Sequence, residues 1–350
     1  MRSEALAVGV LGVGLMGDDH VERLVRRTAG ARLVAVSDAD PARAAAVAAR
    51  HPQVRGIADP LDLVADPEVE AVLIASPGLV HEEQLLACIA HRKPTLCEKP
   101  LTMDAESAVR VMQAERAGGR PLVQVGFMRR FDPEYAAAKQ LLDSGRLGRT
   151  LLLHNTHRNQ QVPDTFGSEM IVRDSLVHEV DVARFLFGEE IAEVTVLGGL
   201  ATRAAGDGVR DPLVALFRMA GGGLVTSEVF VNSQVGYEVR CEVVGERGTV
   251  VVGRNSAGLW TTTFDSLGAA GEHPPGGRWG GSVPPDFRVR FARAYDLEVQ
   301  AWVDACRRGE LVGPTSWDGY AATAVSSAAL ESLRSGLPVS VRLVHRESPS

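Results

Sequence analysis

Two groups of side chains in this sequence could carry out proton and hydride chemistry. The first is Lys99, in the run Cys97-Glu98-Lys99-Pro100. Only three of the 37 basic residues are lysines, and burial can tune the protonation of an amine but not of a guanidinium. Because the proline fixes the following turn, we expect Lys99 at the carboxyl end of a strand, where open α/β sheets bind ligands. A surface lysine after a strand is the alternative interpretation.

The second group is Asp174, His178 and Asp181, whose i, i+4, i+7 spacing predicts one face of a helix. A carboxylate one turn from an imidazole can orient it and raise its basicity, as a general base requires. A solvated acidic stripe that contains a histidine is the alternative. Such a base, with a lysine beside a nucleotide, suits alcohol oxidation, because the base takes the hydroxyl proton while hydride leaves the same carbon for nicotinamide.

A glycine turn predicts where that nucleotide binds. The run Gly12-Val13-Gly14-Leu15-Met16-Gly17 follows an apolar segment and opens a helical pattern. Its glycines permit a tight turn, close approach to a pyrophosphate and packing of helix on strand. Asp38 follows the second apolar run, where an acidic residue binds the adenosine ribose. Since Asp38 would repel a 2′-phosphate, we expect NAD rather than NADP, with Arg43 leaving NADP as the alternative.

The elements that must position these residues change character along the chain. In the first third, short apolar runs alternate with helical patterns, which predicts a doubly wound parallel sheet (an α/β, Rossmann-type arrangement). The expected strands are Ala5–Leu11, Arg32–Ser37, Ala71–Ala75, Pro94–Cys97 and Leu122–Gly126, and the expected helices are Asp19–Thr28, Pro41–Arg50, Leu79–His91 and Asp104–Ala117.

After about residue 150 the pattern predicts an α+β region with a large open, mostly antiparallel sheet. Alternation around Tyr237–Val243 and the turn Gly245–Gly248 indicate a hairpin with one wet face. Further strands are expected at Leu151–His157, Ile191–Leu197, Pro212–Met219 and Leu224–Val231, a loop around one short strand at Gly253–Gly281, and helices at Phe287–Arg308 and Ser316–Arg334.

Composition excludes several classes of protein. The 350 residues are 45% apolar and 23% charged, typical of a globular chain of about two domains. A net charge of −7 argues against nucleic acid as a partner. No run of about 18 apolar residues predicts a membrane span. The four cysteines lack metal-ligand spacing, so we expect no metal, and the first segment lacks a cleavage site, so we expect a cytoplasmic protein.

The glycine turn, Glu98-Lys99-Pro100 and the Asp174/His178 segment together resemble the glucose–fructose oxidoreductase/inositol dehydrogenase (Gfo/Idh/MocA) family. Within that family the resemblance extends to the bacterial inositol 2-dehydrogenases. The more specific segments are Val123–Asp132, His154–Asn159, Asp174–Asp181, Gly236–Gly245, Ala294–Asp296 and Gly313–Tyr320.

The resemblance implies a site in which His178 is the base, Asp174 orients it, and Lys99 hydrogen-bonds the reacting hydroxyl and stabilises developing negative charge. The implied cofactor-binding residues are Gly12, Gly14, Leu15, Met16, Gly17, Asp38, Ser76, Glu98 and Lys99. The implied substrate-binding residues are Lys99, Arg129, His157, Asn159, Asp174, His178 and Tyr237. The implied domains are a dinucleotide-binding Rossmann domain over residues 1–127, a substrate-binding and oligomerisation domain over 128–345, and a tail over 346–350.

The resemblance implies NAD-dependent oxidation of myo-inositol to 2-keto-myo-inositol (scyllo-inosose). It also implies a homotetramer, joined through the face of the large sheet that helices leave uncovered. Two segments that border the expected substrate, Gln160–Glu169 and Ser233-Gln234-Val235, depart from the family pattern. They keep open a second substrate, namely another inositol isomer, an aminocyclitol precursor or a pyranose. A third hypothesis is a non-catalytic regulator that binds NAD and sugar. Such a protein would not need Lys99 and His178, and the presence of both residues favours an enzyme.

Overall fold

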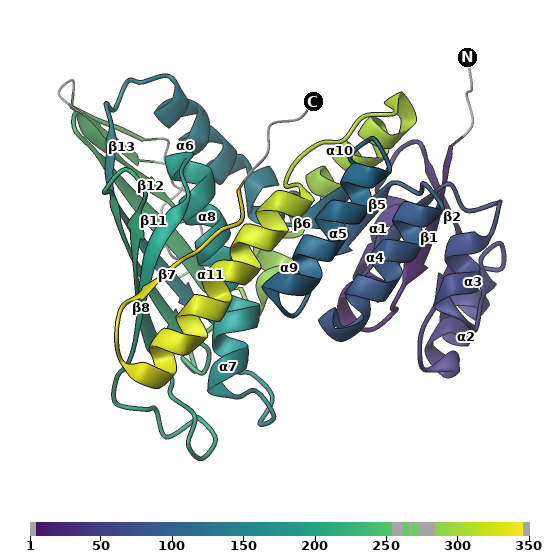
Figure 1. The fold of residues 1–350 in the computed structure, drawn as a ribbon, viewed down its shortest axis with the longest axis horizontal. Helices are drawn as coiled ribbons and strands as arrows, with labels where there is room; N and C mark the ends of the chain where they lie inside the picture. The colour runs from purple at the N-terminus through teal and green to yellow at the C-terminus, as the bar shows by residue number, and fades with distance from the viewer. Residues whose placement is uncertain (1–4, 254–261, 266–267, 272–283, 346–350) are drawn as a thin grey trace, which may run out of the picture. The chain divides into compact units, whose positions relative to one another are not determined.

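The computed structural model describes residues 5–253, 262–265, 268–271 and 284–345 (Figure 1). These residues form two compact units, each made of segments distant in the sequence. The first unit contains residues 1–128 and 293–323, and the second contains residues 129–292 and 324–350. The last helix, α11 (Ser316–Ser335), begins in the first unit and ends in the second.

The first unit is built on a six-stranded parallel sheet of order β3-β2-β1-β4-β5-β6, so the predicted doubly wound fold is confirmed. The order reverses between β1 and β4, and such a switch point is where open α/β sheets bind ligands. The strands are β1 (Leu6–Leu11), β2 (Ala31–Ser37), β3 (Arg55–Gly56), β4 (Ala71–Ile74), β5 (Thr95–Glu98) and β6 (Val123–Gly126). The helices are α1 (Leu15–Arg26), α2 (Pro41–Arg50), α3 (Pro60–Ala65), α4 (His81–Ala90), α5 (Ala105–Ala117) and α10 (Ala292–Arg308).

Both faces of this sheet are buried, as its continuous apolar strands require. On one face Val8 and Val10 of β1 join an apolar cluster with residues of α1, α2 and α10. On the other face, a Cβ added to Gly9 would lie 2.6 Å from Leu63 of α3. Trp302 of α10 is buried in the first face. The core of the dinucleotide-type fold is therefore completed by a helix close to the end of the chain.

Short or irregular elements depart from the sequence-based expectations. The predicted helix Phe287–Arg308 is two helices, α9 (Phe287–Arg290) and α10, because Phe291 leaves the helical conformation with its ring buried. The helix α1 begins at Leu15 rather than Asp19, since Gly14 is its N-cap. The elements β3 and α3 were not predicted, because they are too short to show a period.

The second unit is built on a nine-stranded sheet of order β14-β13-β12-β11-β7-β10-β9-β8-β15. Among the strands in the described part of the chain, β7 and β10 are parallel and the other pairs of this sheet are antiparallel, so the prediction of an open, mostly antiparallel sheet is confirmed. The strands are β7 (Thr150–Arg158), β8 (Ile191–Gly198), β9 (Leu213–Met219), β10 (Leu224–Phe230), β11 (Glu238–Gly245), β12 (Gly248–Val252), β13 (Thr262–Asp265), β14 (Gly268–Gly271) and β15 (Val339–Ser340).

Helices cover one face of this sheet. In the second unit α6 (Pro133–Asp143) and α8 (Val177–Phe187) pack on β7, β8 and β12, and among the described residues no helix of the unit lies on the opposite face (Figure 1). The expectation of one short strand within Gly253–Gly281 is wrong, because β13 and β14 form a second hairpin there. The rest of that predicted loop, and the predicted tail 346–350, lie outside the described residues.

Candidate active site

The glycine turn joins β1 to α1, and its geometry explains the glycines at positions 12 and 17. Gly12 has a φ of +81°, and a Cβ there would lie 2.5 Å from the Ser76 nitrogen. A Cβ on Gly17 would lie 1.8 Å from the Gly12 oxygen. At Gly14, by contrast, the only neighbour within 4 Å is Arg43, at 3.7 Å. No side chain caps this N-terminus of α1, which leaves backbone N–H groups able to bind an anion such as a pyrophosphate.

Asp38 is fixed at the end of β2 by backbone donors. The Val13 N–H donates to its Oδ2 at 2.7 Å, and the Asp40 N–H donates to its Oδ1 at 2.8 Å. Arg43 stands 3.9 Å from Oδ1 and is 58% exposed. The carboxylate is thus held beside the glycine turn, with the Arg43 guanidinium close by.

Histidine 81, which the sequence analysis missed, links the ends of β4 and β5. Its two ring nitrogens lie 2.8 Å from the carbonyl oxygens of Ser76 and Pro100. Burial lowers the pKa of His81. The Ser76 hydroxyl donates to Gln84 at 2.6 Å. One imidazole therefore lies between the strand ends that carry Ser76 and Lys99, and in its neutral form it donates to one of the two carbonyl oxygens. His81 is the first residue of α4 and is followed by Glu82, Glu83 and Gln84, so no local signal distinguished it from a solvent-exposed polar turn.

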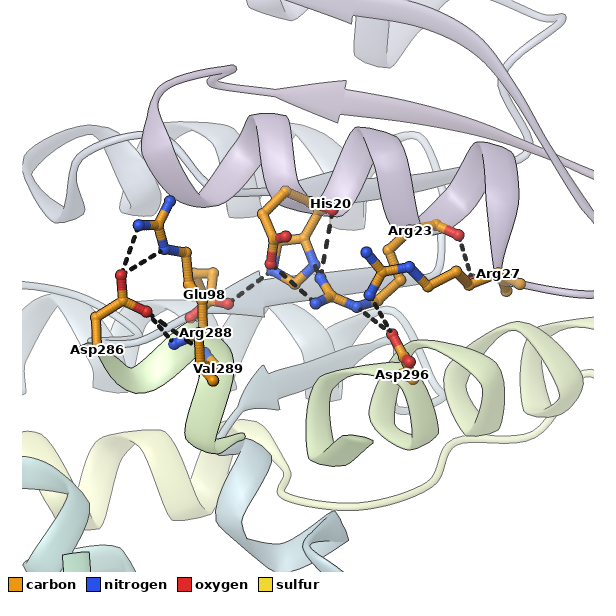
Figure 2. Close-up of polar contacts among 10 residues, drawn as sticks. His20, Arg23, Arg27, Glu98, Asp286, Arg288, Val289 and Asp296 are labelled. Atoms are coloured by element: carbon orange, nitrogen blue, oxygen red, sulfur yellow. Dashed lines mark hydrogen bonds and ion pairs between the residues drawn. The ribbon is translucent and has the colours of Figure 1, made fainter. Parts of the chain in front are cut away.

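Glu98 is the last residue of β5 and directly precedes the half-buried Lys99. Its Oε1 lies 2.8 Å from Nε2 of His20, a second histidine that sequence reasoning missed (Figure 2). Its Oε2 accepts from the Lys99 N–H at 3.3 Å. Burial alone would raise the pKa of the Glu98 carboxyl, but the hydrogen bond from His20 and the charge of Lys99 lower it below its ordinary value.

The second unit contains a buried polar cluster around Glu179. The Arg129 guanidinium donates to Glu179 Oε1 at 2.6 Å, and His157 Nδ1 lies 2.9 Å from the same oxygen. All three side chains are at most 3% exposed. Arg129 comes just before α6, His157 lies on β7 and Glu179 lies on α8. Burial would raise the pKa of Glu179, yet Arg129 and His157 hold it below its ordinary value.

Two aromatic neighbours extend this cluster. The His157 ring packs edge-on against Tyr237, with centroids 5.6 Å apart, and lies 6.3 Å from the His178 ring. Arg129, His157, His178 and Tyr237, four of the predicted substrate residues, are therefore gathered within the second unit. Asn159 follows β7 and fixes a strand end, since its N–H donates to the Phe230 oxygen at 2.9 Å. Its buried side-chain oxygen has no partner among the described residues, so it is an acceptor open to a ligand hydroxyl.

Asp174 and His178 do not share a regular α-helix. Residues Ile171–Leu176 form a π-helical turn, and α8 begins at Val177. The expected α-helical spacing is therefore wrong on the Asp174 side, because a π turn bonds i to i+5 and changes which residues lie on one face. Asp181 pairs instead with Arg130 at 2.6 Å. Single π turns are frequent at functional sites, and this one carries Asp174, the residue predicted to orient His178, four residues before that histidine.

The described residues contain neither a cluster of metal ligands nor a membrane-spanning helix. They hold no group of three or more histidine, cysteine, aspartate or glutamate side chains placed to bind a metal ion. None of their helices is long and apolar enough to cross a membrane.

Comparisons with known proteins agree with these features. Residues 6–127 match the oxidoreductase family with an NAD-binding Rossmann fold, and residues 135–251 match the GFO/IDH/MocA C-terminal domain. The chain is 51% identical over 346 residues to inositol 2-dehydrogenase 2 of Mycolicibacterium vanbaalenii, covering 99% of this chain and 98% of that protein. It is 51% identical over 350 residues to inositol 2-dehydrogenase of Mycolicibacterium smegmatis, covering 98% of each.

Solved structures show the same fold. The myo-inositol dehydrogenase of Lactobacillus casei, crystallised with NAD(H) and myo-inositol, has a TM-score of 0.90 at 31% identity, covering 99% of each chain. The scyllo-inositol dehydrogenase of the same organism, with NAD(H) and scyllo-inositol, has a TM-score of 0.83 at 25% identity, covering 97% of this chain and 99% of that one. The chain therefore belongs to the Gfo/Idh/MocA family of oxidoreductases, whose N-terminal domain is an NAD-binding Rossmann fold.

Proposed function

We propose that this chain oxidises myo-inositol to 2-keto-myo-inositol with NAD. The observation that carries the proposal is the polar cluster of Arg129, Glu179 and His157 beside His178 and Tyr237, in a chain half identical to inositol 2-dehydrogenases. A buried polyol needs a partner for each hydroxyl, and an array of histidine, tyrosine and asparagine supplies such partners without a metal.

In this proposal catalysis is assigned to Lys99, Asp174 and His178. His178 takes the proton of the reacting hydroxyl, and Asp174 orients the imidazole. Lys99 hydrogen-bonds the same oxygen and stabilises the negative charge that develops on it. Bound NAD supplies the hydride acceptor.

The residues of the first unit fit that cofactor. The uncapped N-terminus of α1 suits a pyrophosphate, and the Asp38 carboxylate suits the ribose hydroxyls and disfavours a 2′-phosphate. The residues proposed to bind the cofactor also include Leu15, which is 63% exposed, and Met16, Ser76, Glu98 and Lys99. NAD is accordingly the proposed cofactor, and NADP is the alternative that Arg43 keeps open.

In the second unit His157, Asn159 and Tyr237 are the proposed hydroxyl contacts. Arg129 is 1% exposed and committed to Glu179, so it supports the substrate site by holding Glu179 and His157 in place. Asn159 offers the buried amide oxygen described above.

We further propose a cytoplasmic homotetramer that buries the uncovered face of the large sheet. Val214, Leu216 and Leu224 are each more than 40% exposed on that face. Apolar side chains gathered on one sheet face favour burial against another subunit. We also propose that residues 1–127 form the dinucleotide-binding domain, residues 128–345 form the substrate-binding and oligomerisation domain, and residues 346–350 form a tail.

A second candidate is the same chemistry on another isomer, such as scyllo-inositol. It is favoured by the two segments that depart from the family pattern. In one of them Gln234 has a φ of +65° and Val235 is 72% exposed. A pyranose or an aminocyclitol precursor would use the same residues, and a regulator would bind NAD without turnover.

The deciding experiment measures NADH absorbance at alkaline pH with myo-, scyllo- and D-chiro-inositol and with glucose, using NAD and then NADP. The proposal expects turnover of myo-inositol with NAD to exceed every other combination. Faster turnover of another polyol would show that myo-inositol is not the preferred substrate and would identify that polyol in its place. Tight NAD binding without turnover of any of them would favour the regulator.

A further inference from the structure

A buried histidine stands behind Lys99 in the first unit. His20 lies on the second turn of α1, is 1% exposed, and places Nε2 2.8 Å from Oε1 of Glu98 (Figure 2). Glu98 is the residue immediately before Lys99. The contact therefore joins the helix that begins at the glycine turn to the strand end that carries the lysine.

The Glu98 carboxylate is confined on its other sides. Its Oε2 accepts from the Lys99 N–H at 3.3 Å. Glu98 pairs with Gly126 of β6, and a Cβ added there would lie 3.1 Å from Oε2 and 3.2 Å from the Glu98 Cα. These distances are too short for an unperturbed side chain, so the glycine leaves the space that the carboxylate fills.

The imidazole of His20 is itself fixed by a neighbouring arginine. Arg23 Nη1 lies 3.3 Å from His20 Nδ1, and a guanidinium can only donate. Nδ1 is therefore the acceptor, and Nε2 carries the proton that is donated to Glu98. Arg23 is in turn bound by Asp19 and Asp296, each at 2.8 Å, and lies over the Tyr295 ring at 5.2 Å. The ring orientation is thus set by two helices, α1 and α10.

We propose that His20 is a positioning residue for Lys99, which it holds through the Glu98 carboxylate. The inference rests on the proposed function, in which Lys99 meets the reacting hydroxyl. A hydrogen-bonded Glu98 keeps the Lys99 peptide in one place relative to α1, whose N-terminus receives the cofactor. Misplacement of a reacting group by about 1 Å can cost a hundredfold in rate. A purely structural pair would contribute to stability and leave the chemical step unchanged.

The test compares His20→Leu, which removes the donor, with His20→Gln, whose amide nitrogen can replace Nε2. The matched control is His51→Leu. His51 is also buried, and its Nε2 lies 3.1 Å from Glu22, another residue of α1, so it forms a histidine–glutamate pair remote from Lys99 in sequence. We expect His20→Leu to lower kcat by about tenfold to a hundredfold with KM for NAD unchanged. His20→Gln should recover most of kcat, and His51→Leu should lower Tm without lowering kcat.

The small number of lysines provides a readout that does not depend on turnover. Reductive methylation with ¹³C-formaldehyde labels Lys93, Lys99 and Lys139 besides the amino terminus, and Lys99→Arg assigns the Lys99 signal. In His20→Leu the dimethyl-Lys99 signal should shift in the NMR spectrum while the other two lysine signals stay in place. His20→Gln should restore it, and His51→Leu should leave it unchanged.

The outcomes separate this inference from the proposed function. If the unmodified protein oxidises no polyol, the proposed function fails, while the Lys99 signal still decides whether His20 positions Lys99. An unchanged Lys99 signal in His20→Leu would overturn the inference. Equal losses of kcat in His20→Leu and His51→Leu at equal losses of Tm would also overturn it, since both would then report stability alone.

Discussion

The guanidinium of Arg129 donates a 2.6 Å hydrogen bond to the carboxylate of Glu179, and the two side chains are 1% and 0% exposed. Each charge is buried only because the other neutralises it. The same Glu179 oxygen lies 2.9 Å from His157, so the pair also orients an imidazole of the proposed substrate site. We therefore expect Glu179 to contribute to both stability and activity.

Glu179→Ala should lower the free energy of unfolding by about 3–5 kcal/mol, because it leaves the Arg129 charge buried without its partner. Urea-induced unfolding measures the change. The control is Glu310→Ala, which breaks the exposed Arg308–Glu310 pair, whose side chains are 55% and 58% exposed. That variant should change stability by less than about 1 kcal/mol. Equal effects of the two substitutions would contradict the burial of the Arg129–Glu179 pair.

The contribution of Glu179 to stability should depend on pH. Its pKa in the folded chain lies below the ordinary value of 4.5, because Arg129 and His157 outweigh the effect of burial. The unfolded chain therefore takes up this proton at a higher pH than the folded chain. The stabilisation is complete above pH 4.5 and is lost as the pH falls through the folded pKa.

The stability gap between the wild type and Glu179→Gln should accordingly be largest near neutral pH and should narrow below pH 4.5. Urea unfolding over a pH series measures this gap. Glu310→Gln, which alters the exposed pair with Arg308, should show little gap at any pH. A Glu179→Gln gap that widened on acidification would mean that the sign assigned to the pKa shift is wrong.

Substitution of the proposed catalytic groups should separate chemistry from cofactor binding. Lys99→Ala and His178→Ala should each lower kcat by about 10²–10⁴-fold, the range that a positioned acid or base supplies. NAD binding, followed by titration calorimetry, should survive in both variants. Near-full activity in either variant would remove the assigned role from that residue.

Asp38→Ser should change the choice of cofactor. The substitution removes the carboxylate that we propose binds the ribose, and it releases Arg43, now 3.9 Å from Asp38, to attract a 2′-phosphate. We expect the ratio of kcat/KM for NAD over NADP to fall by about tenfold or more, which corresponds to about 1.4 kcal/mol. Adding Arg43→Ala should remove the gain with NADP. An unchanged ratio in Asp38→Ser would place the ribose elsewhere.

A charge on the uncovered sheet face should disrupt the proposed assembly. Leu216→Glu places a carboxylate among the exposed apolar residues of β9 and β10 and should reduce the mass measured by sedimentation velocity. Leu200→Glu is the control, because Leu200 is 95% exposed in the loop after β8 and lies outside that face. Retention of the wild-type mass by Leu216→Glu would exclude this face as the interface.

Much of the fold could be predicted from local sequence patterns. Continuous apolar runs specify strands buried on both faces, and alternation around Tyr237–Val243 specifies a strand with one wet face. The glycine turn and Asp38 could be identified because turn chemistry and short spacings are local properties of the chain. For the same reason Lys99, which directly precedes a proline at a strand end, could be singled out without coordinates.

The partners of these residues were decided by the tertiary structure. His20 and Glu98 are 78 residues apart, and Arg129 and Glu179 are 50 residues apart. No periodicity links such positions, because their meeting depends on how distant elements pack. Likewise, the pattern at Asp174 and His178 predicts an α-helix, whereas the folded chain forms a π turn before α8. Local preferences therefore determined which elements and reactive groups this protein has, and long-range packing decided which carboxylate each buried cation and imidazole meets.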